Sequence, residues 1–210
     1  MGEDFRRQRN IGMLAIFASI PVAVALWYGV DRFLPPLAGL ETPGARLLFA
    51  LKCWCVAVLF CLVTGVEAVA HERLWSPAFD PLSGFETRRM RVNQRYLQNT
   101  LEQTVVLAAA LFGLAAYCRD GAAMRAVVAT TVVWILGRLA FWLGYHRGAA
   151  FRALGAPGMA VSLIVLLYVG WRFGDELAGP WGAAGVLAGF GLFEMLLLWA
   201  TRPLKNREEA

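Results

Sequence analysis

The chain has 210 residues, 59% of them hydrophobic, and a formal net charge of +5. So much apolar content with so few strand or loop signals excludes an ordinary soluble domain and predicts an all-α, polytopic transmembrane helical bundle. The positive charge suits a membrane surface, and no nucleic-acid partner is expected because the sequence has no Gly-rich phosphate loop and no interleaved basic and aromatic residues.

Hydropathy in windows of about 19 residues predicts six membrane-spanning helices. They cover residues 11–33, 46–69, 97–117, 124–145, 155–172 and 181–200. With six spans, thirteen arginines and lysines fall on one side of the membrane and five on the other. The basic side carries both termini, so both are expected to be cytoplasmic, and the first helix is expected to be retained, not cleaved as a signal peptide.

The segment between the second and third helices, "SPAFDPLSGFETRRMRVN", is the longest polar stretch. Thr87 within it can cap a helix that begins before the membrane. That helix then carries "RYLQNTLEQ", with Arg95, Asn99 and Glu102 at i, i+4 and i+7. At 3.6 residues per turn the last lies only ~20° round from the first, so the three share one face. Side chains this polar are costly in lipid, so they indicate either a functional site or hydrogen bonds between helices.

The fourth helix keeps an arginine inside its apolar run, in "GRLAFWLGYHRGAAFRALG". Arg138, Phe141 and Tyr145 are spaced to share a face, and Arg147 and Arg152 follow. Arg138 could bind a ligand or form a structural ion pair with Glu67 or Glu102. The neighbouring His146 is expected to be a solvated residue at the membrane surface.

These two polar clusters are expected to meet, because the short turn "YCRDGAAMR" makes the third and fourth helices antiparallel neighbours. Together they offer guanidinium groups for carboxylates, an amide, and a carboxylate for an ammonium group. A small zwitterionic peptide with two carboxylates fits this set, and glutathione is such a peptide. A nearby arginine would also stabilise its thiolate, the reactive form of the thiol.

The motifs "RYLQNTLEQ" and "GRLAFWLGYHRGAAFRALGAP" resemble those of the MAPEG family, the membrane-associated proteins in eicosanoid and glutathione metabolism. They are most similar to the leukotriene synthase and microsomal glutathione transferase branch. The resemblance implies a homotrimer with a glutathione cofactor, acting as a transferase or peroxidase on lipophilic, eicosanoid-like substrates. It also implies a four-helix core at residues 46–173, with an added helix in 1–45 and another in 174–210.

The resemblance assigns roles by position. Arg152 falls where the family has its thiol-activating, catalytic arginine, and Arg73 where an arginine reaches across the subunit boundary. The remaining glutathione-binding candidates are Arg95, Asn99, Glu102, Arg138, Tyr145 and Arg147. No metal site is expected.

Three positions depart from the family pattern, because Leu97, Gln103 and Phe141 replace a glutamine and two tyrosines. Their lost polar contacts leave open a non-catalytic MAPEG-like protein that binds lipid or a partner. A transporter remains a third and weaker alternative, since its charged path would have to run through residues that gather mostly at one face: Lys52, Glu67, Glu102, Arg138 and Glu194.

Overall fold

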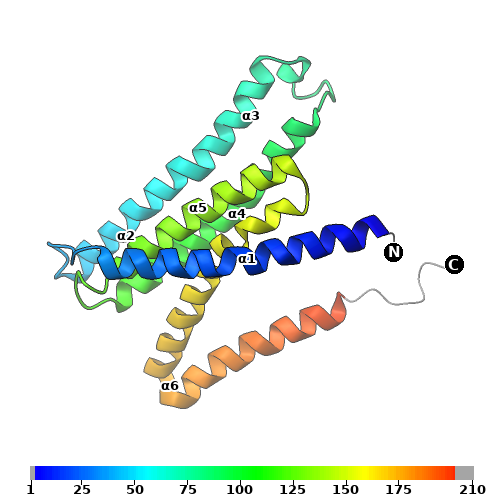
Figure 1. Cartoon of the computed structure of the whole chain (residues 1–210). Helices are drawn as coiled ribbons and strands as arrows, with labels where there is room; N and C mark the ends of the chain where they lie inside the picture. Colours follow the sequence, from blue (N-terminus) through cyan, green and yellow to red (C-terminus); the bar gives the residue numbers. More distant parts are fainter. Residues whose placement is uncertain (1–2, 202–210) are drawn as a thin grey trace. The chain divides into compact units, whose positions relative to one another are not determined.

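The computed structural model describes residues 3–201, and all regular secondary structure in that range is helical. Five of its helices are long and apolar enough to cross a membrane: Asp4–Phe33, Pro43–Leu74, Arg88–Tyr117, Arg125–Arg147 and Phe151–Ala200 (Figure 1). The protein is therefore an all-α, multi-pass membrane protein. Three of the basic residues in the predicted charge asymmetry, Arg202, Lys205 and Arg207, lie outside the described residues.

The second span is one continuous rod, made of two helices and the π-helical segment between them (Figure 1). After α1 (Glu3–Phe33), two prolines at 35 and 36 prevent the helix from continuing. The next helix, α2 (Pro43–Ala57), begins at Thr42, whose hydroxyl accepts a hydrogen bond from the backbone N–H of Ala45 at 3.2 Å. It passes through η1 (Val58–Val63) directly into α3 (Thr64–Leu74).

The helix that carries Arg95, Asn99 and Glu102 begins before the predicted span, as the capping signal indicated. A short 3-10 turn, η2 (Pro77–Phe79), lies in the preceding loop. The following helix, α4 (Arg88–Tyr117), is capped by Thr87, whose hydroxyl accepts from the backbone N–H of Met90 at 3.0 Å. The predicted span began only at residue 97, because hydropathy detects the part of a helix that enters lipid and not its polar first turns.

The core forms around α4 and α5 (Arg125–Arg147). α4 packs against α2, α3 and α5, while α1 packs against α5 and the 3-10 turn η3 (Phe151–Gly155) that follows it (Figure 1). Glycines permit the closest approach: a Cβ added at Gly137 would lie 2.7 Å from the Cα of Gly158. Small residues at such crossings let membrane helices pack backbone to backbone.

The last helix, α6 (Ala156–Ala200), contains a break that reconciles five long helices with six predicted spans. Ala178 and Gly179 have non-helical backbone angles, Gly179 with φ +61°, and Pro180 follows. Glycine adopts that angle without strain, and the proline ring prevents an uninterrupted helix. The parts before and after the break are each about 20 residues long, sufficient for one crossing. They correspond to the predicted fifth and sixth helices.

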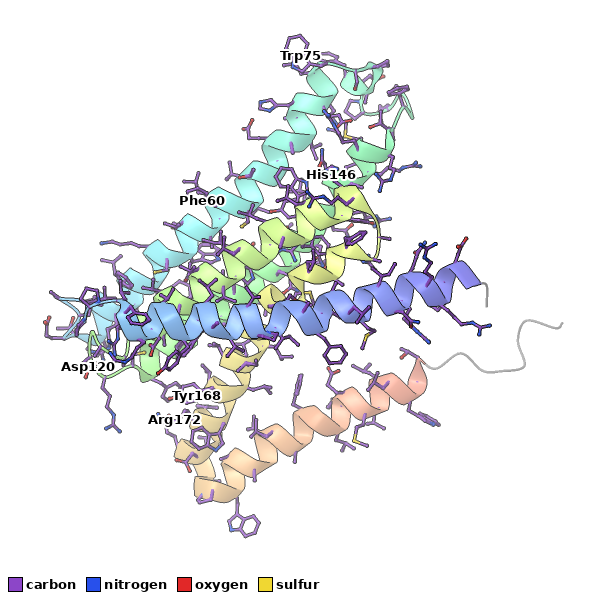
Figure 2. The ribbon with its side chains drawn as sticks, viewed as in Figure 1. Phe60, Trp75, Asp120, His146, Tyr168 and Arg172 are labelled. Atoms are coloured by element: carbon purple, nitrogen blue, oxygen red, sulfur yellow. The ribbon has the colours of Figure 1, made fainter. Side chains whose placement is uncertain are left out.

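The described residues divide into two compact units, one ending at Leu166 and one beginning at Leu167. Within the second unit the two parts of α6 approach closely, since a Cβ at Gly174 would lie 2.7 Å from the carbonyl carbon of Gly182. Arg172 in this unit donates a hydrogen bond to the Tyr168 hydroxyl at 3.1 Å (Figure 2). The division into residues 1–45, 46–173 and 174–210 stays a prediction.

Candidate functional site

A polar pocket of about 590 Å³ opens between α4, α5, η3 and the start of α6. This volume lies within the usual range for small-molecule sites. Five of the eight predicted site residues line it. The complete lining is Arg95, Gln98, Asn99, Glu102, Phe141, Tyr145, Arg152, Ala153, Ala156 and Met159.

The α4 wall of the pocket is an ordered row of polar side chains. Arg95 Nη1 donates to Gln98 Oε1 at 3.2 Å, and Gln98 Nε2 donates to Glu102 Oε1 at 3.5 Å. Asn99 Oδ1 is buried and accepts no hydrogen bond from the described residues. Gln98 was missed in the sequence, although its i+3 and i+4 spacing to Arg95 and Glu102 is the signal that identifies it.

The opposite wall is aromatic and carries the second arginine. The rings of Phe141 and Tyr145 meet edge to face, with centroids 5.8 Å apart. Arg152 Cζ lies 5.7 Å from the Tyr145 ring centroid, within cation–π distance. Gly144 permits this arrangement, because a Cβ there would lie 2.7 Å from the carbonyl carbon of Phe151. The η3 turn can therefore fold back against α5 and bring Arg152 to the pocket.

The charges of the pocket favour an anionic ligand. Arg95, Glu102 and Arg152 are all solvent-exposed side chains of the lining. No ion pair joins any two of them among residues 3–201. The two guanidinium groups can therefore bind two carboxylates, or a carboxylate and a thiolate, and the Glu102 carboxylate can bind an ammonium group.

Three predicted site residues lie outside this pocket. Arg147 is exposed at the end of α5, and Arg73, expected to act across a subunit boundary, is half-buried near the end of α3. Arg138 is fully buried behind the aromatic wall. Its Nη2 donates to Thr100 Oγ1 at 2.9 Å, and its Cζ lies 4.5 Å from the Phe141 ring centroid.

Of the two alternatives for Arg138, the structure contradicts the ion pair with Glu67 or Glu102. Glu67 is exposed and lies 3.3 Å from His71, one helical turn away on the same helix. Glu102 faces the polar pocket and interacts with Gln98. Arg138 points into the interior between α4 and α5, where its nearest partners are a hydroxyl and aromatic rings.

Only one of the three departures from the family pattern touches the pocket. Phe141 lines it, so a hydroxyl is missing from the aromatic wall. Leu97 packs instead against the buried cluster of Val69, Ala78 and Met90. Gln103 is half-buried and outside the lining. The loss of polar groups at 97 and 103 therefore leaves the pocket wall unchanged.

A buried carboxylate that the sequence did not reveal holds α3 to α4. Glu72 is only 7% exposed, and its oxygens accept hydrogen bonds from three side chains. The Thr87 hydroxyl and Arg89 Nε both donate at 2.7 Å, and Asn93 Nδ2 donates at 3.3 Å.

The same network continues to α5. Asn93 Oδ1 accepts from Trp142 Nε1 at 2.9 Å and lies 3.0 Å from His146 Nε2. The backbone carbonyl of His146 accepts from Arg88 at 3.1 Å. His146 is thus half-buried and hydrogen-bonded at the end of α5, and it is less solvated than expected (Figure 2). Its partners are more than fifty residues away along the chain, so no local pattern could reveal them.

This geometry defines the class of the protein: it is an all-α, multi-pass membrane protein with a polar pocket on its third and fourth spans. The model of the MAPEG family matches residues 47–174, more than half of the chain, and the chain belongs to that family.

Two curated relatives add to this assignment. The chain is 26% identical to Transmembrane protein 79 of Bos taurus over 168 residues, which is 80% of this chain and 41% of the relative. It is 24% identical to Transmembrane protein 79 of Mus musculus over 162 residues, 77% and 41% of the respective lengths. The chain thus spans about two fifths of the length of these relatives. No solved structure matches it.

Proposed function

We propose that this MAPEG protein binds glutathione in the polar pocket and activates its thiol with Arg152. The activated thiol would react with lipophilic electrophiles, which makes the protein a glutathione-dependent transferase or peroxidase of the leukotriene synthase and microsomal glutathione transferase type. The observation that supports the proposal is the joint lining of one pocket by Arg95, Asn99, Glu102, Tyr145 and Arg152.

Each wall of the pocket has a part in this chemistry. On α4, the Glu102 carboxylate suits the ammonium group of the tripeptide and the Arg95 guanidinium suits a carboxylate. Across the pocket, the Arg152 guanidinium would stabilise negative charge on sulfur. A free thiol of this kind titrates near ~8.5, and a fixed positive charge increases the fraction of thiolate at neutral pH. In a transferase step the thiolate sulfur forms a bond to the electrophilic carbon. In a substitution the bond from that carbon to the leaving group breaks and the leaving group departs with the electron pair; in an addition the resulting anion takes up a proton from water.

We also propose a homotrimer with the ligand at the subunit boundaries, because the cores of this family assemble in that way. The exposure of Arg95, Glu102 and Arg152 in the single chain supports a site that a neighbouring subunit completes. Arg73 is the residue that the neighbour would supply.

A non-catalytic MAPEG-like protein that binds lipid or a partner is the second candidate. It is favoured by Phe141, which removes a hydroxyl from the pocket wall. The relatives are also named only Transmembrane protein 79, with no activity in the name. The transporter alternative is weaker. Lys52, Glu67 and Glu194 are exposed and line none of the polar pocket, so they form no path through it.

Thiolate formation separates these candidates. Purified protein is titrated with glutathione while the ultraviolet absorbance of the thiolate is followed against pH, and binding is measured in parallel by calorimetry. We expect the bound thiol to titrate below its free value of ~8.5 in the wild type and near that value in Arg152→Ala, with binding retained. Arg152→Lys should restore only part of the effect, because an ammonium group lacks the planar fork of a guanidinium.

Arg119→Ala is the matched control, since Arg119 is an exposed arginine in the turn at the other end of α4. Its titration should equal that of the wild type. Binding without thiolate formation would favour the non-catalytic candidate. An absence of binding would refute the glutathione site altogether.

A further inference from the structure

A second hollow lies on the other side of the first turns of α6. This groove of about 440 Å³ runs between α1, α5 and α6. α1 supplies Ile20, Val24 and Tyr28 to its walls, and α6 supplies Pro157 and Ala160. No charged side chain lines it. It lies wholly within the first compact unit, and α1, which forms one wall, precedes the residues that match the family model.

α1 packs along α5 and η3, and two of its contacts lie near the ends of the groove. Near one end, Trp27 Nε1 donates to Thr130 Oγ1 at 3.2 Å. Near the other, Gly12 packs on η3, where an added Cβ would lie 3.7 Å from the carbonyl oxygen of Ala150. The hollow lies between these contacts. The indole N–H of Trp27 is already hydrogen-bonded. A ligand in the groove therefore meets apolar surface and the Tyr28 hydroxyl.

Its length and position match one leaflet of a bilayer. Ile20 and Tyr28 are eight residues apart, which at 1.5 Å per residue is roughly 12 Å, close to half of a hydrocarbon core of about 30 Å. α1, α5 and α6 are all candidate membrane spans. Trp27 and Tyr28 are residue types that mark the membrane–water interface. The groove therefore extends from an interface toward the middle of the bilayer, where the surrounding medium is acyl chains.

We propose that this groove holds one acyl chain of a membrane lipid, with the lipid head group beside Trp27 and Tyr28. Asp31 and Arg32 follow on α1 with opposite charges, so these two residues together supply no net charge for selecting an acidic head group. The lipid is recognised by its chain. The site is independent of glutathione, because α6 presents Ala156 and Met159 to the polar pocket and different residues to the groove.

Retention in the groove depends on close packing. The tails of bulk lipids are as apolar as the groove walls, so transfer from the bilayer brings no hydrophobic gain. A chain that fits between two tethered helices makes more dispersion contacts than one on an open helix face. The measurable consequence is saturation: the groove fills at a low mole fraction of lipid probe, while exposed faces sample the probe in proportion to its abundance.

The test uses the full chain in phosphatidylcholine vesicles that contain increasing fractions of phosphatidylcholine with a photoreactive group in its acyl chain. Labelled residues are located by mass spectrometry. We expect labelling at groove residues of α1 and α6 to reach a plateau, and labelling at Val22, which is 68% exposed and outside the groove, to rise linearly. Photoreactive phosphatidylglycerol should give the same plateau.

Ala160→Trp places an indole in the groove and should lower groove labelling several-fold at low probe fraction, leaving only the linear component. Val22→Trp is the matched control, because it adds the same side chain outside the groove and should leave the plateau unchanged. If Ala160→Trp unfolds at a lower temperature than the wild type, Ala23→Trp closes the groove from the α1 side.

Two results would overturn the proposal. Linear labelling of the groove in the wild type would show that lipid only passes through it. With a photoreactive amino acid introduced at Ile20 in place of the lipid probe, cross-links to residues 180–200 or to a second copy of the chain would show that protein fills it.

Discussion

Substitution of Glu72 measures how strongly the end of α3 is held to the start of α4. Its buried carboxylate accepts from Thr87 and Arg89 at 2.7 Å and from Asn93 at 3.3 Å. A buried charge-assisted hydrogen bond contributes about 1.5–3 kcal/mol. Arg89 is 71% exposed, so its share falls to about 1 kcal/mol or less through solvent screening. With the bonds from Thr87 and Asn93 at the lower end of that range, Glu72→Ala should destabilise the protein by at least about 3 kcal/mol.

The assay is thermal unfolding in one mild detergent, with each variant measured at the same scan rate. For a chain of this size about 3 kcal/mol corresponds to roughly 6–12 °C in the unfolding midpoint. Glu67→Ala is the matched control on the same helix. Its carboxylate is 57% exposed and forms an ion pair only with His71 among the described residues, so Glu67→Ala should destabilise the protein by less than about 0.5 kcal/mol. Equal shifts for the two variants would refute the assignment of Glu72 as the junction of α3 and α4.

Three further predictions concern the pocket, the assembly and the topology. Glu102→Gln should weaken glutathione binding about tenfold or more, since a charge-assisted contact of about 1.5–3 kcal/mol is lost. Unchanged affinity by calorimetry would leave Arg95, Asn99 and Glu102 with a structural role only. The detergent-corrected mass should be that of a trimer, and a monomeric mass would contradict the proposed assembly. A reporter fused after Ala210 should be cytoplasmic if the basic side faces the cytoplasm, and an extracytoplasmic signal would reverse the proposed orientation.

The positions of the pocket residues follow largely from helical periodicity. Arg95, Asn99 and Glu102 were expected on one face of a helix, and they line one wall of one pocket. Tyr145 and Arg152 were expected at the neighbouring helix end, and they form the opposite wall. A period of 3.6 residues and a short connecting turn determine both facts, because each is local in the sequence.

The hydrogen-bond partners did not follow from the sequence. Glu72 was overlooked because its bonds to Thr87 and Asn93 cross a loop whose path no periodicity describes. A carboxylate partner was one alternative for Arg138 because it lies deeper in its helix than the other candidates, and it instead donates to Thr100 and faces aromatic rings. Local spacing determines the face on which a side chain lies, but the rotation and depth of neighbouring helices determine what it meets.

Arg138 therefore leads to a prediction about its own contribution to stability. The side chain is fully buried, and its Nε and Nη1 donate to no partner among the described residues. Its one hydrogen bond, to Thr100, contributes about 1.5–3 kcal/mol. Its cation–π contacts with Phe141 and Tyr96 contribute about 0.5–2 kcal/mol each. Burial of a guanidinium costs several kcal/mol, so the gains and the cost roughly cancel.

Arg138→Met keeps most of the side-chain volume and removes the buried charge, so its unfolding midpoint should equal or exceed that of the wild type. Arg138→Ala removes the volume as well and should lose about 2–5 kcal/mol to the cavity. The comparison separates packing from charge at a single position. If the methionine variant is as stable as the wild type but binds glutathione more weakly, the charge acts on the pocket through Phe141, which lines the pocket and whose ring centroid lies 4.5 Å from Arg138 Cζ. A loss of more than about 3 kcal/mol in Arg138→Met would contradict this balance, because the buried charge would then have to be strongly stabilised in the folded protein.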